Sequence, residues 1–275
     1  MQLFELLGQE TTITYSDLKL LLFCIPAFCL YRILVSKFLL IPLSKHVVEK
    51  NRYKFVHRGF DCIHYFTSAI LGTLAFLQRP YAHCPFYFVD CLKFIICTGD
   101  NCVCSLFEKI YYFYFVSYYL SDVFWISTTK DIKMLVFHHT ITIVMVVCTA
   151  VCARPASGLS TMVLHDWSDI FLYSGKISSY LNWKKASDML LLIFAGSFIY
   201  LRLFNVLVIV WAIFADPTPQ PHHSKFWLFG RSLMFGLYMC HIIWGYQIIK
   251  ALVNIFKGDK IRDTRSDELK KSKKE

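Results

Sequence analysis

Long apolar runs separated by short polar segments make up most of the chain. Seven of these runs are close to the length of about 20 residues that a helix needs to cross the hydrocarbon core of a bilayer. Transmembrane β-strands would instead appear as segments of about ten residues with alternating polarity. The pattern therefore predicts an all-α polytopic membrane protein with about seven transmembrane helices. Their expected ranges are 18–43, 60–78, 106–127, 132–152, 157–181, 188–213 and 226–256.

Two further segments bear on the number of membrane-spanning helices. The stretch 84–97 is too short and too interrupted to span, so we expect it to be interfacial or re-entrant. The first seventeen residues lack the basic region and the small-residue cleavage site of a signal peptide, which predicts that the first helix is retained. The composition agrees with a membrane protein. Only 17% of the residues are charged, against about 25% in soluble domains, and the mean hydropathy is +0.47.

Basic residues are distributed unevenly between alternate loops. Seventeen lysines and arginines lie in segment 44–59, near residues 130 and 184, and in the C-terminal tail, against four on the other side. Cytosolic loops of membrane proteins carry such an excess, which predicts a lumenal N-terminus and a cytosolic C-terminus. The net charge of +10 then belongs mostly to the cytosolic face, so nucleic acid is not an expected partner. Lys271 and Lys273 also resemble a dilysine-type retrieval signal of endoplasmic reticulum proteins; a solvated basic tail near anionic lipid is the alternative.

Five of the eleven cysteines crowd a segment that this topology places in the lumen. They are Cys84, Cys91, Cys97, Cys102 and Cys104. An oxidising lumen would permit a disulfide, but the number is odd. No CxxC pair is present, which argues against zinc. The sequence therefore leaves a disulfide in this segment open.

Ionisable residues inside three predicted spans point to a functional site, because charges in a bilayer are costly and usually face the bundle interior. They are Glu108 and Asp122 in the third span, His138 and His139 in the fourth, and His165, Asp166, Asp169 and Lys176 in the fifth. Helical spacing places His165, Asp169 and Lys176 on one face. Packed core groups would explain one such residue more easily than six on two adjacent spans.

A carboxylate beside an imidazole fixes the tautomer of the ring and stabilises its cation, which suits general-base or nucleophilic catalysis. At 1.5 Å of rise per residue, Asp169 is expected nearer to the depth of the histidine pair than His165. Asp169 is therefore the expected partner of the pair, in a site that opens toward the cytosol. A di-iron site is the main alternative, but Met134 and Leu135 stand where its HxxHH cluster would need histidine. His222 and His223, in a lumenal loop, also lack a partner at metal spacing, so no metal is expected.

The segment "FHHTITI", followed 26 residues after its second histidine by "LHDWSDIFLYSGKISSY", resembles the Lag motif of ceramide synthases within the TLC domain. The matching residues are His138, His139, Arg154, Gly158, His165, Asp166, Ser168, Asp169, Leu172, Lys176 and Tyr180. The tyrosine-rich segment ending in Lys130 and Asp131, and "FIYLRLFNVLVIV" with Arg202, are also similar to that family. The likeness covers about residues 45–255. Tyr173 departs from it, because many members have glutamate there.

The resemblance implies a TLC-type bundle with three parts. They are an N-terminal segment with the first transmembrane helix (1–44), a TLC domain with six transmembrane helices (45–256), and a basic cytosolic tail (257–275). It also implies acyl transfer from acyl-CoA to the amine of a sphingoid base in the endoplasmic reticulum membrane, with acyl-CoA as co-substrate and no bound cofactor. Membrane lipid and a second subunit, as a homo- or heterodimer, are further expected partners.

On this resemblance and the spacing together, the expected site divides into two sets. The expected catalytic residues are His138, His139, His165, Asp166 and Asp169. The expected substrate-binding residues are Arg154, Lys176, Tyr180, Tyr118, Tyr119, Lys130 and Arg202. A non-enzymatic TLC-domain lipid sensor or translocation factor is the alternative function. A different acyltransferase or a lipid-modifying TLC-domain enzyme is a second alternative.

Overall fold

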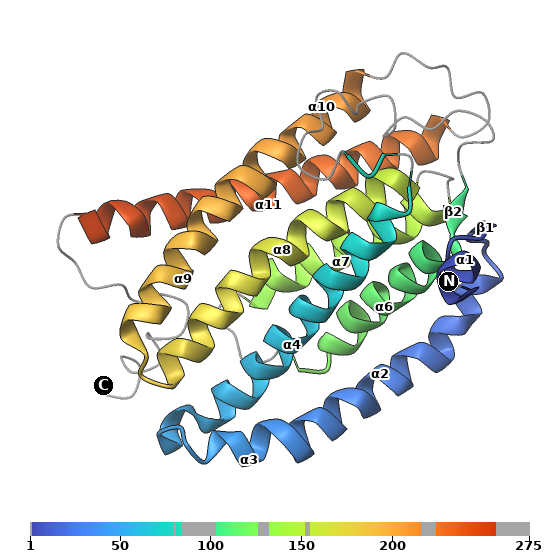
Figure 1. Ribbon diagram of the computed structural model, residues 1–275. Helices are drawn as coiled ribbons and strands as arrows, with labels where there is room; N and C mark the ends of the chain where they lie inside the picture. Colours follow the sequence, from blue (N-terminus) through green and yellow to red (C-terminus); the bar gives the residue numbers. More distant parts are fainter. Residues whose placement is uncertain are drawn as a thin grey trace.

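The computed structural model describes residues 2–79, 81–83, 103–125, 132–151, 155–215 and 224–256. Within them, seven long helical segments form one bundle (Figure 1). The helices are α2 (Leu21–Val35), α4 (Glu49–Leu77), α6 (Leu106–Asp122), α7 (Ile132–Val151), α8 (Pro155–Tyr180), α9 (Lys184–Ser197) with α10 (Val206–Ala215), and α11 (Ser224–Phe256). Helix α2 is preceded by the 3-10 turn η1 (Asp17–Leu20) and continued by the π-helical η2 (Ser36–Leu40) and α3 (Ile41–Ser44). A short helix, α1 (Gln2–Leu7), begins the described chain.

Five segments of the described chain are long and apolar enough to cross a membrane. They are Asp17–Ser44, Glu49–Leu77, Ile132–Ala150, Lys184–Ala215 and Leu228–Asn254. The two other long helices are α6, which has 17 residues, and α8, which carries the His-Asp motif. The predicted all-α multi-pass membrane architecture is confirmed, whereas the count of seven spans is not. Helix α8 packs against α4, α6, α7, α9 and the π-helical η6 (Phe198–Asn205), so protein surrounds its polar side chains.

The basic segment 44–59 is not the loop that its charge suggested. Helix α4 begins at Glu49, eleven residues before the expected start of the second span at residue 60. Lysine, arginine and glutamate are strong helix formers, so a charged sequence extends the helix beyond its apolar part. Arg58 and Asp61 lie one turn apart and form an ion pair at 3.0 Å, which supports this first part of α4.

A small sheet joins the N-terminal segment to the start of α6, and the sequence did not predict it. Strand β1 (Glu10–Thr11) pairs antiparallel with β2 (Cys104–Ser105). Ser105 then caps α6, because its hydroxyl accepts from the Glu108 backbone while the Glu108 carboxylate accepts from the Ser105 backbone. Glu108, buried, also accepts from the Tyr81 hydroxyl and pairs with Arg79 at 3.2 Å. This carboxylate is therefore a structural group at the end of a helix.

The turns that carry basic residues lie at the same end of the bundle. Figure 1 shows the α3–α4 turn, the α8–α9 turn and the last residues of α11 at one end, with the β1–β2 sheet at the other. Lys45 and the pair Lys184–Lys185 thus share one end, as the uneven charge distribution predicted. The orientation of that end relative to the cytosol stays a prediction.

Some expectations lie outside the described residues. These are the interfacial stretch 84–97, four of the five crowded cysteines, the loop histidines 222 and 223, and the tail 257–275. Cys104, the member of this group that the structure describes, is a free thiol. The question of a lumenal disulfide therefore stays open.

Candidate active site

Three histidines from three helices meet in the interior of the bundle. His138 of α7 has its ring centroid 6.2 Å from that of His165 of α8 and 6.2 Å from that of His241 of α11. All three side chains are buried, and the edge of Trp244 closes one side of His138 at 4.8 Å. We call His138, His165 and His241 the histidine cluster.

Hydrogen bonds determine which of two of these rings donates a proton and which accepts it. The Nδ1 of His165 lies 2.6 Å from the carbonyl oxygen of Thr161, and a carbonyl only accepts, so the proton sits on Nδ1. The Nε2 of neutral His165 is then an acceptor. It lies 2.8 Å from Nε2 of His241, which therefore donates. His241, His165 and the Thr161 carbonyl form a directed proton chain beside His138.

His138 and His241 each have a buried Nδ1 without a hydrogen bond among the described residues, and His138 is the one outside the proton chain. Its Nδ1 is buried and makes no hydrogen bond with any residue that the structure describes. Thr142, one turn further along α7, has a buried hydroxyl that also makes no hydrogen bond with any described residue. Buried polar atoms are usually hydrogen-bonded, because desolvation without a partner is costly. This face of α7 is therefore suited to polar groups of a substrate.

Asp166 faces away from the histidine cluster, although it follows His165 directly. Its Oδ2 accepts hydrogen bonds from Ser68 of α4 and Tyr111 of α6, both at 2.6 Å. Consecutive helical residues point about 100° apart, so the His-Asp dipeptide serves two different neighbours. Asp166 ties α8 to α4 and α6, while His165 faces α11.

Asp169 is bound by an arginine rather than placed against the histidine pair. Its carboxylate lies 2.6 Å from the guanidinium of Arg202, which also donates to the His165 carbonyl at 2.8 Å. Arg202 reaches α8 from η6, where the widened π-helical turn buries Arg202 and Asn205. Such π-segments recur at functional sites. The residue of α8 whose ring lies beside His138 is His165, where the sequence favoured Asp169.

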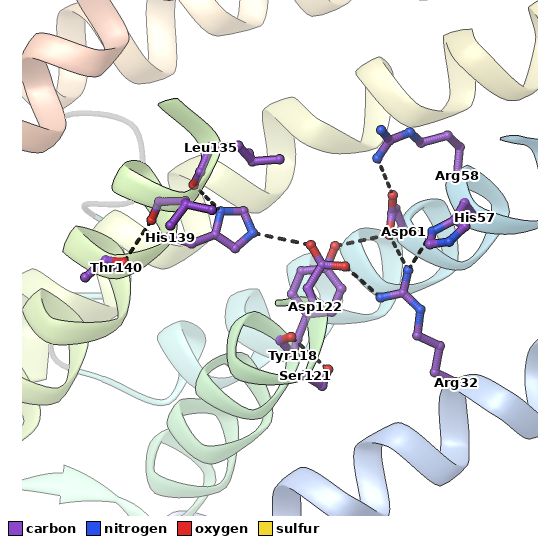
Figure 2. Close-up of polar contacts among 11 residues, drawn as sticks. Arg32, His57, Arg58, Asp61, Tyr118, Ser121, Asp122, Leu135, His139 and Thr140 are labelled. Atoms are coloured by element: carbon purple, nitrogen blue, oxygen red, sulfur yellow. Dashed lines mark hydrogen bonds and ion pairs between the residues drawn. The ribbon is translucent and has the colours of Figure 1, made fainter. Parts of the chain in front are cut away.

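His139 belongs to a second polar network, which Figure 2 shows. Its Nδ1 lies 3.0 Å from the Leu135 carbonyl, and its Nε2 lies 3.4 Å from Oδ2 of Asp122, at ion-pair distance. The ring also packs on Tyr119, with centroids 4.8 Å apart. The carboxylate that contacts the pair His138–His139 thus comes from α6, and the two histidines serve separate networks.

Comparison with known families identifies the domain that carries these residues. The family model described as the TLC domain matches residues 54–250, which is more than half of the chain. The chain belongs to the TLC domain family.

Relatives of this TLC protein include plant and mammalian proteins. Ceramide synthase LOH1 of Arabidopsis thaliana is 26% identical over 94% of this chain and 93% of its own length. Ceramide synthase 1 LOH3 of the same organism is 24% identical over 94% of this chain and 92% of its own. Ceramide synthase 3 of Mus musculus is 31% identical over 57% of this chain and 42% of its own.

The expected substrate-binding residues of the TLC protein have different placements. Tyr118 and Tyr119 are buried in α6, and Tyr118 stacks on His64. Lys176 lies over the Tyr173 ring at 5.7 Å, and Tyr180 ends α8. Arg202 is at the site, as described above. Lys130 and Arg154 lie outside the described residues.

The sequence analysis missed several residues of the TLC protein that the structure places at the site. They are His241, Trp244, Arg32 and Asp61. The rule that ionisable residues within spans are functional would have selected His241 and Arg32, since each interrupts an apolar run. Asp122 is one of the ionisable residues of the predicted spans, but the sequence does not indicate its place in the site. Among the described residues, no group of three His, Cys, Asp or Glu side chains is arranged to hold a metal ion.

Proposed function

We propose that this TLC protein is a ceramide synthase that transfers a fatty acyl group from acyl-CoA to the amine of a sphingoid base. The relatives whose names are ceramide synthase, in plants and mammals, support this reaction. The observation that carries the proposal is the histidine cluster, where the buried Nδ1 of His138 has no hydrogen bond within the described chain and a directed proton chain lies beside it.

The reaction needs a group that accepts a proton or an acyl group inside the bundle. In one route, the unprotonated nitrogen of His138 attacks the thioester carbon, the C–S bond breaks, and the CoA thiolate leaves and takes up a proton. The amine then attacks the acyl-imidazole, loses a proton and releases His138. In the other route, His138 removes the proton from the amine as the amine attacks the thioester directly; the C–S bond breaks, and the CoA thiolate leaves and takes up that proton. The His165–His241 pair orients the site and carries protons in both routes.

The other polar groups would hold this geometry. Arg202 fixes the backbone of His165 and the carboxylate of Asp169, and Asp166 anchors α8 to α4 and α6. Acyl-CoA is the proposed co-substrate, with its anionic part at the basic end of the bundle and its acyl chain among the helices. The proposal requires no resident cofactor.

The test is N-acylation by membranes from ceramide-synthase-deficient cells that express the chain, with a panel of acyl-CoAs and sphingoid bases. Wild type is expected to form ceramide, and His138→Ala is expected to lose at least about 100-fold of the rate at equal protein level. His46→Ala, in the exposed α3–α4 turn, is the control and is expected to be fully active. Full activity of His138→Ala would refute the assignment. Absence of ceramide formation by wild type would favour a lipid sensor or translocation factor.

Intact-mass spectrometry separates the two routes. Incubation with acyl-CoA alone should add one acyl group to wild type and none to His138→Ala if the acyl-imidazole forms. If neither protein gains an acyl group and wild type still produces ceramide, the result would support the general-base route.

We also propose residence in the endoplasmic reticulum membrane with the N-terminus in the lumen. The uneven distribution of basic residues and the lysines at 271 and 273 support this placement. Epitope tags at the two termini, probed after selective permeabilisation of the plasma membrane, test it. Accessibility of an N-terminal tag from the cytosol would contradict the orientation.

A further inference from the structure

Arg32 is a buried arginine in the last turn of α2, inside the candidate membrane span Asp17–Ser44, which precedes the segment matched by the TLC family model. An arginine at this depth is expensive for a membrane helix, and such residues usually face partners in the bundle interior. Arg32 is only 3% exposed, so its charge is compensated by protein.

The guanidinium of Arg32 has polar partners from two other helices, α4 and α6. It donates to Oδ1 of Asp122 at 2.7 Å, contacts Nδ1 of His57 at 3.1 Å, and lies 3.7 Å from Oδ1 of Asp61. Its planar face also lies over the Trp125 ring at 4.6 Å. These contacts leave the guanidinium one orientation, in which a donor is aimed at Asp122.

Asp122 uses its two carboxylate oxygens for two different residues. Oδ1 binds Arg32, and Oδ2 lies 3.4 Å from Nε2 of His139. A carboxylate is rigid and planar, so the group that holds one oxygen also aims the other. Figure 2 shows this line from α2 through α6 to α7, with His139 at its end.

The remaining charge of the network is already balanced. Asp61 pairs with Arg58 at 3.0 Å and accepts from the Tyr118 hydroxyl at 3.3 Å. Arg32 is consequently the cation that compensates Asp122. The opposite nitrogen of His139 lies 3.0 Å from the Leu135 carbonyl, so Nε2 is directed at the Asp122 carboxylate, 3.4 Å away.

We infer that Arg32 is a positioning residue of the acyl-transfer site: through Asp122 it holds the ring of His139, the neighbour of His138. This inference rests on the proposed N-acyltransferase function. It assigns the first transmembrane helix a part in the reaction, although that helix lies outside the family match at 54–250.

The experiment compares Arg32→Gln, Arg32→Lys, Asp122→Asn and the double variant, each purified in nanodiscs and normalised to folded protein. Arg32→Gln should lower kcat at least about tenfold with KM for acyl-CoA within about twofold, because substrate contacts are untouched. Arg32→Lys restores the charge and should recover part of kcat. The double variant should be no slower than Asp122→Asn, because Arg32 acts through that carboxylate.

Arg79→Gln is the matched control. Arg79 also forms a buried ion pair, with Glu108 at 3.2 Å, but at the other end of α6. Both substitutions therefore remove a guanidinium from a buried carboxylate. Arg79→Gln is expected to leave kcat of the folded fraction unchanged. Two results would overturn the inference. One is an equal loss of kcat in Arg32→Gln and Arg79→Gln, and the other is a double variant whose loss of kcat is the product of the losses in Arg32→Gln and Asp122→Asn.

A readout that needs no turnover separates this inference from the proposed function. The nitrogen resonances of ¹⁵N-labelled His139, assigned by their loss in His139→Gln, should move in Arg32→Gln and stay in Arg79→Gln. If wild type forms no ceramide, the proposed function fails, and the His139 resonances alone decide whether Arg32 sets this ring. Unchanged resonances in Arg32→Gln would refute the inference whatever the activity.

Discussion

The ion pair between Asp169 and Arg202 offers a stability test that separates folding from chemistry. The pair is nearly buried, and its closest atoms are 2.6 Å apart. The perturbations are Arg202→Met, Asp169→Leu and the double variant. Each single substitution removes one charge and leaves the other in the bundle interior, whereas the double variant removes both.

The expected magnitudes follow from the cost of an uncompensated buried charge. Removing one partner of a buried ion pair costs about 3–5 kcal/mol, while replacing both by apolar side chains is often close to neutral. One kcal/mol shifts Tm by about 2–4 °C in proteins of roughly this size. Each single variant should therefore melt about 6–20 °C below wild type. The double variant should recover most of that loss.

Thermal unfolding in detergent micelles, followed with a thiol-reactive dye, is a suitable assay because Cys240 is buried and free in the native fold. All three variants should have low acyl-transfer activity, because Arg202 also holds the carbonyl of His165. A double variant that is as unstable as the sum of the singles would refute the reasoning about charge. A stable double variant with wild-type activity would show that the ion pair has no role in the site.

Three further results are expected. His241→Phe removes the donor to His165 and should lower kcat about 10- to 100-fold. Tyr246→Phe, on the exposed face of α11, is the control. Equal rates for the two variants would contradict the proton chain. Glu108→Gln removes the charge that Arg79 compensates and should destabilise the protein by about 3 kcal/mol while turnover per folded molecule is unchanged, as checked by Tm and kcat together. Burial and the neighbouring Glu108 raise the pKa of the Cys104 thiol to about 12, so it stays protonated at pH 8; alkylation mapped by mass spectrometry should reach Cys104 only after unfolding, and rapid native labelling would contradict its burial.

The helices could be predicted from the sequence because apolar runs report directly on membrane length. The start of α4 was wrong because charge was interpreted as a loop, although the residues Glu49–Arg58 favour a helix. Within the predicted span 157–181, helical spacing placed His165 and Asp169 on one face, and the structure buries both side chains in α8. Periodicity within a helix was therefore informative.

The partners of the polar residues could not be predicted, because they depend on which helices pack together. His165 binds His241, which is 76 positions away along the chain, and Asp122 faces an arginine 90 positions before it. Taken alone, the fourth and fifth spans favour Asp169 as the partner of the histidine pair. The contributions of α2, α6 and α11 to the site are long-range contacts that no local pattern encodes.

The polarity of α8 also has a consequence for how the protein is made. A charged residue at mid-bilayer costs about 2.5–3.5 kcal/mol on insertion scales, and α8 carries Asp166, Asp169 and Lys176. The groups that compensate Asp166, on α4 and α6, are synthesised before α8, whereas Arg202 follows it. The ion pair between Asp169 of α8 and Arg202 can therefore form only after η6 has been synthesised. A nascent chain on a ribosome stalled before Arg202 would contain α8 but lack the ion pair between Asp169 and Arg202.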